Sequence, residues 1–210
     1  MASPRSPYDP IFHRDGDPRA EAEAAAARAA FDRAARAYLA SPLPWLAWAM
    51  VLPAAALTTP AVGRRYGEAG VLALWSATIL LGGAIEGLAL LRARRRRQPG
   101  PLGTWAMRVQ GNLSLVAVAL SALLVWVGQA DHLPAVWLLL LGHSFFALGG
   151  LAFAPLRTAG VVLQLGGAAA LASGVLSLAA APPLALFAAA TGAGCGWVAY
   201  GLWRRRRDER

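Results

Sequence analysis

The chain has 210 residues, of which 57% are hydrophobic, and its mean hydropathy is +0.47. These values exceed the apolar share of ordinary soluble domains, and the excess lies in long runs. The formal net charge is +9, and all 20 basic residues are arginine. The arginines border apolar segments rather than forming a solvated basic face, so we expect no nucleic-acid partner. Cys195 is the single cysteine, which excludes an internal disulfide and a thiolate metal cluster.

The N-terminal region is the one long polar part of the chain. Residues 1–18 are rich in proline, aspartate and arginine, so we expect a disordered arm. Residues 19–40 are rich in alanine, and Arg28, Asp32 and Arg36 follow at four-residue spacing, which predicts a cytoplasmic or interfacial helix. The first apolar run begins only near Pro44. We therefore expect the first span to act as its own insertion signal and to remain in the protein.

Six apolar segments follow, each of about 18 to 23 residues, which is enough to cross a hydrocarbon core of about 30 Å. The sequence therefore predicts an all-α, polytopic membrane protein with six transmembrane helices after a short N-terminal cytoplasmic helix. The transmembrane domain covers 41–204, and 205–210 form a basic cytoplasmic tail. The spans are expected at 45–62, 71–91, 105–127, 133–153, 159–179 and 184–203.

Arginine is distributed unequally over the connections between these spans. The N-terminal arm, the second connection (92–97), the fourth connection (Arg157) and the tail are basic, whereas only Arg64 and Arg65 stand on the opposite side. Because basic flanks resist translocation, both termini are expected in the cytoplasm. The use of arginine without lysine and the richness in alanine and glycine are typical of a GC-rich bacterial genome, so we expect the protein in the inner membrane of a bacterium. The tryptophans fall near the predicted span ends, which is typical of headgroup anchors.

Ionisable residues within a span are costly and therefore attract attention as functional candidates. Glu86 and Arg108 have similar depth on consecutive spans. They could form an ion pair, or Arg108 could extend to the headgroups. A proton-handling or ligand-handling role for Glu86 is the functional alternative.

His143 falls near the middle of the fourth span. It could carry a proton or bind a haem iron or another metal, but no second ligand is evident, so we expect a buried neutral histidine bonded to Asn112 or Ser144. Asn112, Gln110 and Gln164 could line a polar cavity with Glu86 and Arg108, or could hold helices together by hydrogen bonds.

Small residues at four-residue spacing predict close helix packing. Gly83 with Gly87 and Gly192 with Gly196 form two such pairs, and further glycines lie on neighbouring spans. We expect these faces to serve packing within the chain first and oligomerisation second.

Three segments in the last part of the chain carry a resemblance. LPAVWLLLLG begins at Leu133, APLRTAG begins at Ala154 and is expected to form a short turn, and YGLWRRRR ends at Arg207. Over residues 133–207 this pattern resembles a family of small, uncharacterised six-span bacterial inner-membrane proteins. The resemblance implies an inner-membrane protein and transfers no functional residue.

No Walker loop, metal-ligand spacing or GxSxG motif is present, so we expect no catalytic, cofactor-binding or metal-binding residues and no cofactor. The leading hypothesis is a non-enzymatic membrane protein, an accessory or regulatory subunit that packs its helices against a membrane-protein partner or a second copy. The alternative is a small transporter or channel. A membrane enzyme or haem protein is the third class. The candidate polar path comprises Glu86, Arg108, Asn112, His143 and Gln164.

Overall fold

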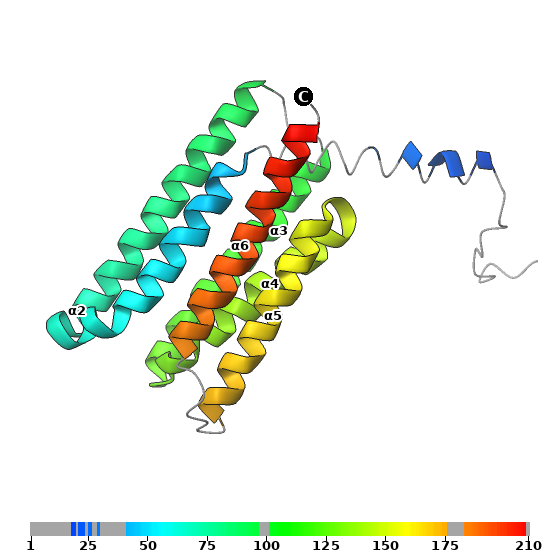
Figure 1. Cartoon of the computed structure of the whole chain (residues 1–210). Helices are drawn as coiled ribbons and strands as arrows, with labels where there is room; N and C mark the ends of the chain where they lie inside the picture. The colour runs from blue at the N-terminus through cyan, green and yellow to red at the C-terminus, as the bar shows by residue number, and fades with distance from the viewer. Residues whose placement is uncertain are drawn as a thin grey trace, which may run out of the picture.

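The computed structural model describes residues 18–19, 21–23, 25–26, 29, 41–96, 101–175 and 183–208. Within these ranges the regular structure is helical and contains no strand, so the predicted all-α class is confirmed (Figure 1). Five of the described helices are long and apolar enough to cross a membrane. The helices are α2 (Leu43–Arg96), α3 (Pro101–Trp126), η1 (Ala130–His132), α4 (Leu133–Ala152), α5 (Ala154–Val175) and α6 (Pro183–Asp208).

The N-terminal region is described only in short pieces. The described residues between 18 and 29 are helical and exposed, and they fall in the region where a cytoplasmic or interfacial helix is predicted over 19–40. The remainder of that helix and residues 1–17 of the predicted arm lie outside the described residues.

Helix α2 is a hairpin rather than one straight rod. At Gly67 the backbone has φ 65° and ψ −162°, a conformation that glycine adopts at far lower cost than residues with a Cβ. The chain folds back at this point, as Figure 1 shows at the α2 label. The first half of α2 (43–66) includes the predicted span 45–62, and the second half (68–96) includes the predicted span 71–91. The residues between these two spans were expected to connect them and are also helical, apart from Gly67.

A second hairpin joins α3 to α4 through another glycine with positive φ, Gly128 at 73°. Backbone bonds from Gly128 N–H to Val125 O (3.1 Å) and from Gln129 N–H to Leu124 O (2.7 Å) close the end of α3. Pro134 stands in the first turn of α4, where its missing N–H removes no helical bond. Helices α3 and α4 lie within a few residues of the segments 105–127 and 133–153, for which the sequence predicts spans.

Helices α4 and α5 are separated by a single non-helical residue, Phe153, with φ −154° and ψ 104°. The Phe153 N–H donates to Gly149 O at 3.3 Å, and its carbonyl accepts from Leu156 N–H at 2.9 Å. The prediction that APLRTAG forms a turn and that a helix begins only at residue 159 was wrong, because α5 begins at Ala154. Pro155 is compatible with the first helical turn and does not delay it.

The tightest packing lies between α4 and α5, where glycine lets the two backbones touch. A Cβ at Gly160 would stand 2.4 Å from Phe146 N and 2.7 Å from Gly142 O, and one at Gly149 would stand 2.2 Å from Arg157 N. By contrast, an added Cβ would meet no atom within 4 Å at three glycines of the two predicted small-residue pairs, namely Gly83, Gly87 and Gly196. The expectation that these three pack within the chain was wrong for the described structure.

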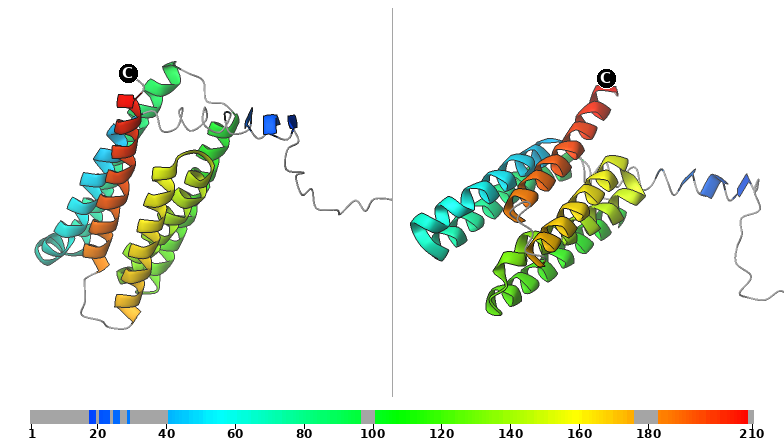
Figure 2. Two further views of the ribbon diagram at one scale, coloured as in Figure 1. Left: turned by 45° about the vertical axis from the view of Figure 1, so that its right-hand side comes forward. Right: turned by 60° about the horizontal axis from the view of Figure 1, so that its bottom comes forward.

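Helix α6 joins the two parts of the molecule. It packs against α2 on one side and α5 on the other, while α5 also packs along α4 and α3 packs chiefly on α4. In the described helices α2 makes no comparable backbone contact with α3, and α6 lies between the α2 hairpin and α5 (Figure 2). One buried cluster (Phe153, Leu156, Ala159, Val198, Leu202) and another (Ala56, Leu138, Leu163, Phe187, Ala188, Ala190) fill these contacts.

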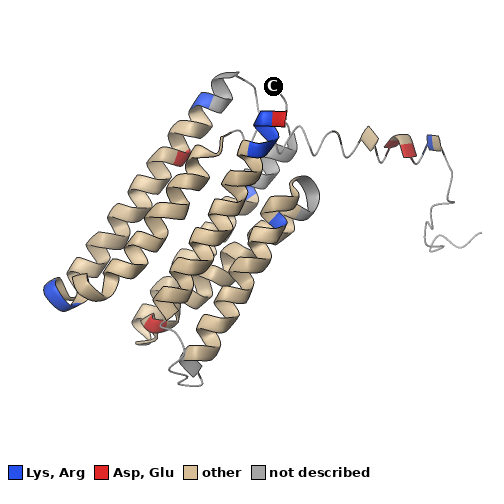
Figure 3. Ribbon diagram, in the orientation of Figure 1, with Lys and Arg blue, Asp and Glu red and all other residues tan. Residues whose placement is uncertain are grey.

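Charged residues gather at the ends of the bundle (Figure 3). Helix α6 continues through the arginine run to Asp208, so the tail expected at 205–210 is helical as far as the chain is described. Arg207 lies over the Trp203 ring, with its guanidinium carbon 5.9 Å from the ring centroid.

Candidate functional site

A groove with a volume of about 2180 Å³ lies between the α2 hairpin and the α3–α4 hairpin. Helices α5 and α6 contribute Leu163 and Phe187 to its lining. It runs from Pro44, near the start of α2, to Gly67 and Gly128 at the hairpin turns. The groove therefore extends along most of the bundle.

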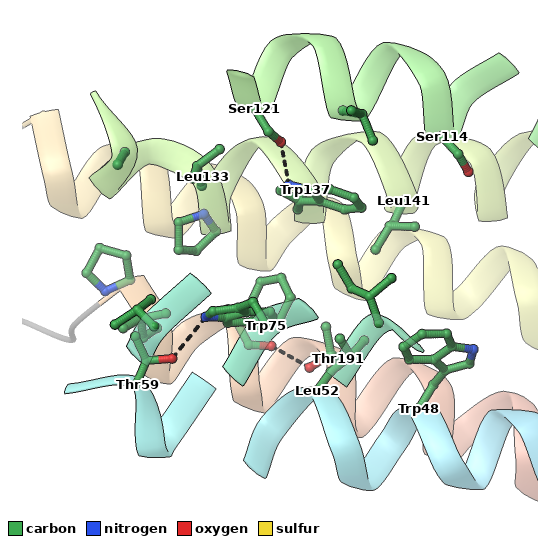
Figure 4. Close-up of a pocket in the computed structure, with 18 of the residues that line it drawn as sticks. Trp48, Leu52, Thr59, Trp75, Ser114, Ser121, Leu133, Trp137, Leu141 and Thr191 are labelled. Atoms are coloured by element: carbon green, nitrogen blue, oxygen red, sulfur yellow. Dashed lines mark hydrogen bonds between the residues drawn. The ribbon is translucent and has the colours of Figure 1, made fainter. Parts of the chain in front are cut away.

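Two tryptophans on opposite walls of the groove are anchored in the same way. Trp75 Nε1 donates to Thr59 Oγ1 at 3.0 Å, and Trp137 Nε1 donates to Ser121 Oγ at 2.9 Å. In each case the indole stands on the second helix of a hairpin and the hydroxyl on the first (Figure 4). Since a buried indole N–H needs an acceptor, these bonds hold two large rings at the groove wall. Trp75 also contacts the Phe187 ring edge-on, with centroids 5.7 Å apart.

Trp48 is the third anchored tryptophan, and its partner is a carboxylate. Its Nε1 donates to Glu86 Oε2 at 3.2 Å across the two halves of α2. The ring lies directly over Gly82, where an added Cβ would stand 2.2 Å from Cη2 of the indole. Gly82 and Glu86 are four residues apart and so share one helix face. Together they define a seat for Trp48.

The five residues predicted as a polar path do not meet in one place. Glu86 is half-buried and is the one of the five that lines the groove. Arg108, Asn112 and His143 are exposed on α3 and α4, and Gln164 lies against Gly142 on the α4 side of α5. The described residues show no ion pair between Arg108 and Glu86, whose carboxylate is bonded to Trp48 instead.

The polar contact near the middle of α3 and α4 differs from the predicted one. Ser144 Oγ donates to Gln110 Oε1 at 2.6 Å, whereas His143 is exposed rather than buried. The prediction of a buried His143 was therefore wrong, because the neighbouring Ser144 occupies the inward position and Gln110 is its partner. Gln110 lines the groove and ties α3 to α4.

No group of three or more histidine, cysteine, aspartate or glutamate residues within the described ranges could hold a metal ion. The ionisable residues that line the groove are Glu86 together with Glu68, Asp131 and His132 near the hairpin turns, and Cys195 on α6. This arrangement offers acceptors and aromatic faces for binding.

Sequence reasoning treated Trp48, Trp75 and Trp137 as headgroup anchors and overlooked their hydroxyl and carboxylate partners. The positions of these residues relative to the glycines at the turns could have predicted two of the partners. Thr59 and Trp75 are equidistant from Gly67 in the sequence, and in an antiparallel hairpin such residues face each other. Ser121 and Trp137 stand in almost the same relation to Gly128.

Comparisons with protein-family models, with curated proteins and with solved structures found no match to this chain.

Proposed function

We propose that this chain is a six-span protein of the bacterial inner membrane, with both termini in the cytoplasm, and that its groove binds an elongated amphipathic molecule from the bilayer. The break at Gly67 supports six spans, because it divides the longest helix into two segments of bilayer length. The excess of arginine on one side of the predicted spans supports the orientation.

The observation that carries the binding function is the groove itself. Pockets for drug-sized ligands typically measure about 300 to 1,000 Å³, and this groove is larger, at about 2180 Å³. Its walls are mainly aliphatic and aromatic, with the hydroxyls of Thr59 and Ser121 already bonded to indoles. A long apolar body suits this lining better than a small polar metabolite.

Native mass spectrometry of the full chain in mild detergent tests the proposal, because a groove ligand should be retained as an added small mass. Ala122 lines the groove and is exposed, while Ala119 is exposed on the same helix and does not line it. Ala122→Trp should displace the ligand, and Ala119→Trp should retain it. Equal retention by both variants would refute a ligand in the groove.

A second candidate keeps the leading sequence hypothesis of an accessory or regulatory subunit. The groove follows the length of the α2 hairpin, and a membrane helix of about 10 to 12 Å diameter is a suitable occupant. In that case a stoichiometric membrane-protein partner should copurify with the wild type and with Ala119→Trp but be lost from Ala122→Trp. The same purification therefore separates the two candidates.

A further inference from the structure

The groove has a charge opposite to that of the whole protein. The chain carries a formal net charge of +9, yet the described residues lining the groove include Glu68, Glu86 and Asp131 and no arginine. The arginines that are described lie elsewhere, many of them at helix ends. Charge complementarity therefore favours a cation as the groove ligand.

Of the three carboxylates that line the groove, Glu86 lies farthest from the hairpin turns at Gly67 and Gly128. It stands in the second half of α2, and Oε2 accepts the indole N–H of Trp48 at 3.2 Å. The indole is a neutral donor, so this hydrogen bond leaves the negative charge of the carboxylate without a positive partner. An ionised carboxylate at membrane depth is costly unless a positive charge pairs with it.

Aromatic rings also line this groove. Trp45 and Trp48 line it from the first half of α2, and Phe145 lines it from α4. Trp45 and Phe145 meet edge-on with centroids 5.2 Å apart, which links the two walls. The faces of such rings attract cations, and aromatic cages recognise quaternary ammonium groups in this way.

We propose that the Glu86 end of the groove binds an organic cation with a large apolar body, such as a lipophilic ammonium. The carboxylate of Glu86 neutralises the positive centre, the rings of Trp45, Trp48 and Phe145 contact its substituents, and the remaining groove takes the apolar body. This inference rests on the proposed binding function of the groove and adds the charge of the ligand.

Tetraphenylphosphonium is a suitable probe because it combines one positive charge with a wholly aromatic surface. Equilibrium dialysis of the radiolabelled probe against the detergent-solubilised full chain, corrected with protein-free micelles, measures its binding. Triphenylphosphine oxide, which is uncharged, serves as the apolar control. The wild type should bind the cation about tenfold or more tightly than the neutral probe, which corresponds to one close charge interaction.

Glu86→Gln should weaken cation binding by about tenfold and leave neutral-probe binding unchanged. The control, Glu68→Gln, removes the same charge near the hairpin turn and should weaken cation binding less. Equal losses in both variants would show a dependence on net charge alone and overturn the site. So would equal affinity of the wild type for the two probes, a result that needs no variant to fold. Binding of neither probe would instead refute the groove function itself.

Discussion

The seat of Trp48 provides a sharp test, because adjacent glycines differ in their surroundings. An alanine Cβ at Gly82 would stand 2.2 to 2.6 Å from three atoms of the Trp48 ring, whereas one at Gly83 would meet no atom within 4 Å. We expect Gly82→Ala to drive the indole from its seat and to break its bond to Glu86. Gly83→Ala should leave the structure unchanged.

The magnitude follows from three contributions. Overpacking a rigid ring costs about 1 to 3 kcal/mol, and the lost interhelical hydrogen bond costs about 0.6 to 2 kcal/mol in a membrane protein. Both variants gain the same helix propensity, about 1 kcal/mol for replacing glycine with alanine, so this gain cancels in the comparison. Gly82→Ala should therefore be less stable than Gly83→Ala by about 2 to 5 kcal/mol.

Reversible unfolding in mixed detergent micelles, with titration of a denaturing detergent, measures this difference. Near-ultraviolet circular dichroism should at the same time show a changed tryptophan signal for Gly82→Ala and an unchanged one for Gly83→Ala. If the two variants unfold within about 0.5 kcal/mol of each other, a range expected of changes that disturb no contact, the indole does not occupy the seat and the reasoning fails.

Two further predictions concern the bonds that hold Trp75 and Trp137 and the close contact between α4 and α5. Ser121→Ala and Thr59→Val each remove the acceptor of one indole and should lower the free energy of unfolding by about 0.6 to 2 kcal/mol; a loss of tryptophan near-ultraviolet signal without a loss of stability would contradict this. Gly160→Ala places a Cβ 2.4 Å from the backbone nitrogen of Phe146 and should cost at least about 3 kcal/mol, the upper end for overpacking. Gly196→Ala meets no atom and should stabilise the protein by up to about 1 kcal/mol through helix propensity. Thermal unfolding of the two glycine variants in one detergent decides this.

The helical class and most helix positions follow from the sequence because apolar length is a strong signal in a membrane protein. Leu133 was predicted as the first residue of a span and begins α4. The start of α5 was missed because proline and arginine in APLRTAG are typical of turns, yet both fit the first turn of a helix. Side-chain orientation is the harder problem, since apolar spans lack the polar face that fixes rotation in soluble helices.

This explains the mixed outcome at the candidate site. Depth along a span is readable from sequence, so Glu86 and Gln110 were singled out. The rotation of a helix about its own axis cannot be read from the sequence. For this reason His143 was expected in the inward position that Ser144 occupies, and Arg108 was expected beside Glu86. The close packing of Gly142 and Gly160 depends on how α4 and α5 cross, which spacing within one helix does not determine.

The position of α6 has a consequence for how the protein is made. A chain is synthesised from its N-terminus, so the α2 hairpin and the α3–α4–α5 unit enter the bilayer before the helix that joins them. Until α6 is inserted, the described ranges of the two earlier parts share few backbone contacts, and the edge-on contact of Trp45 with Phe145 is a side-chain link between them. Assembly is thus completed only when α6 has entered the bilayer, and a chain truncated before Pro183 should consist of two units with few backbone contacts between them.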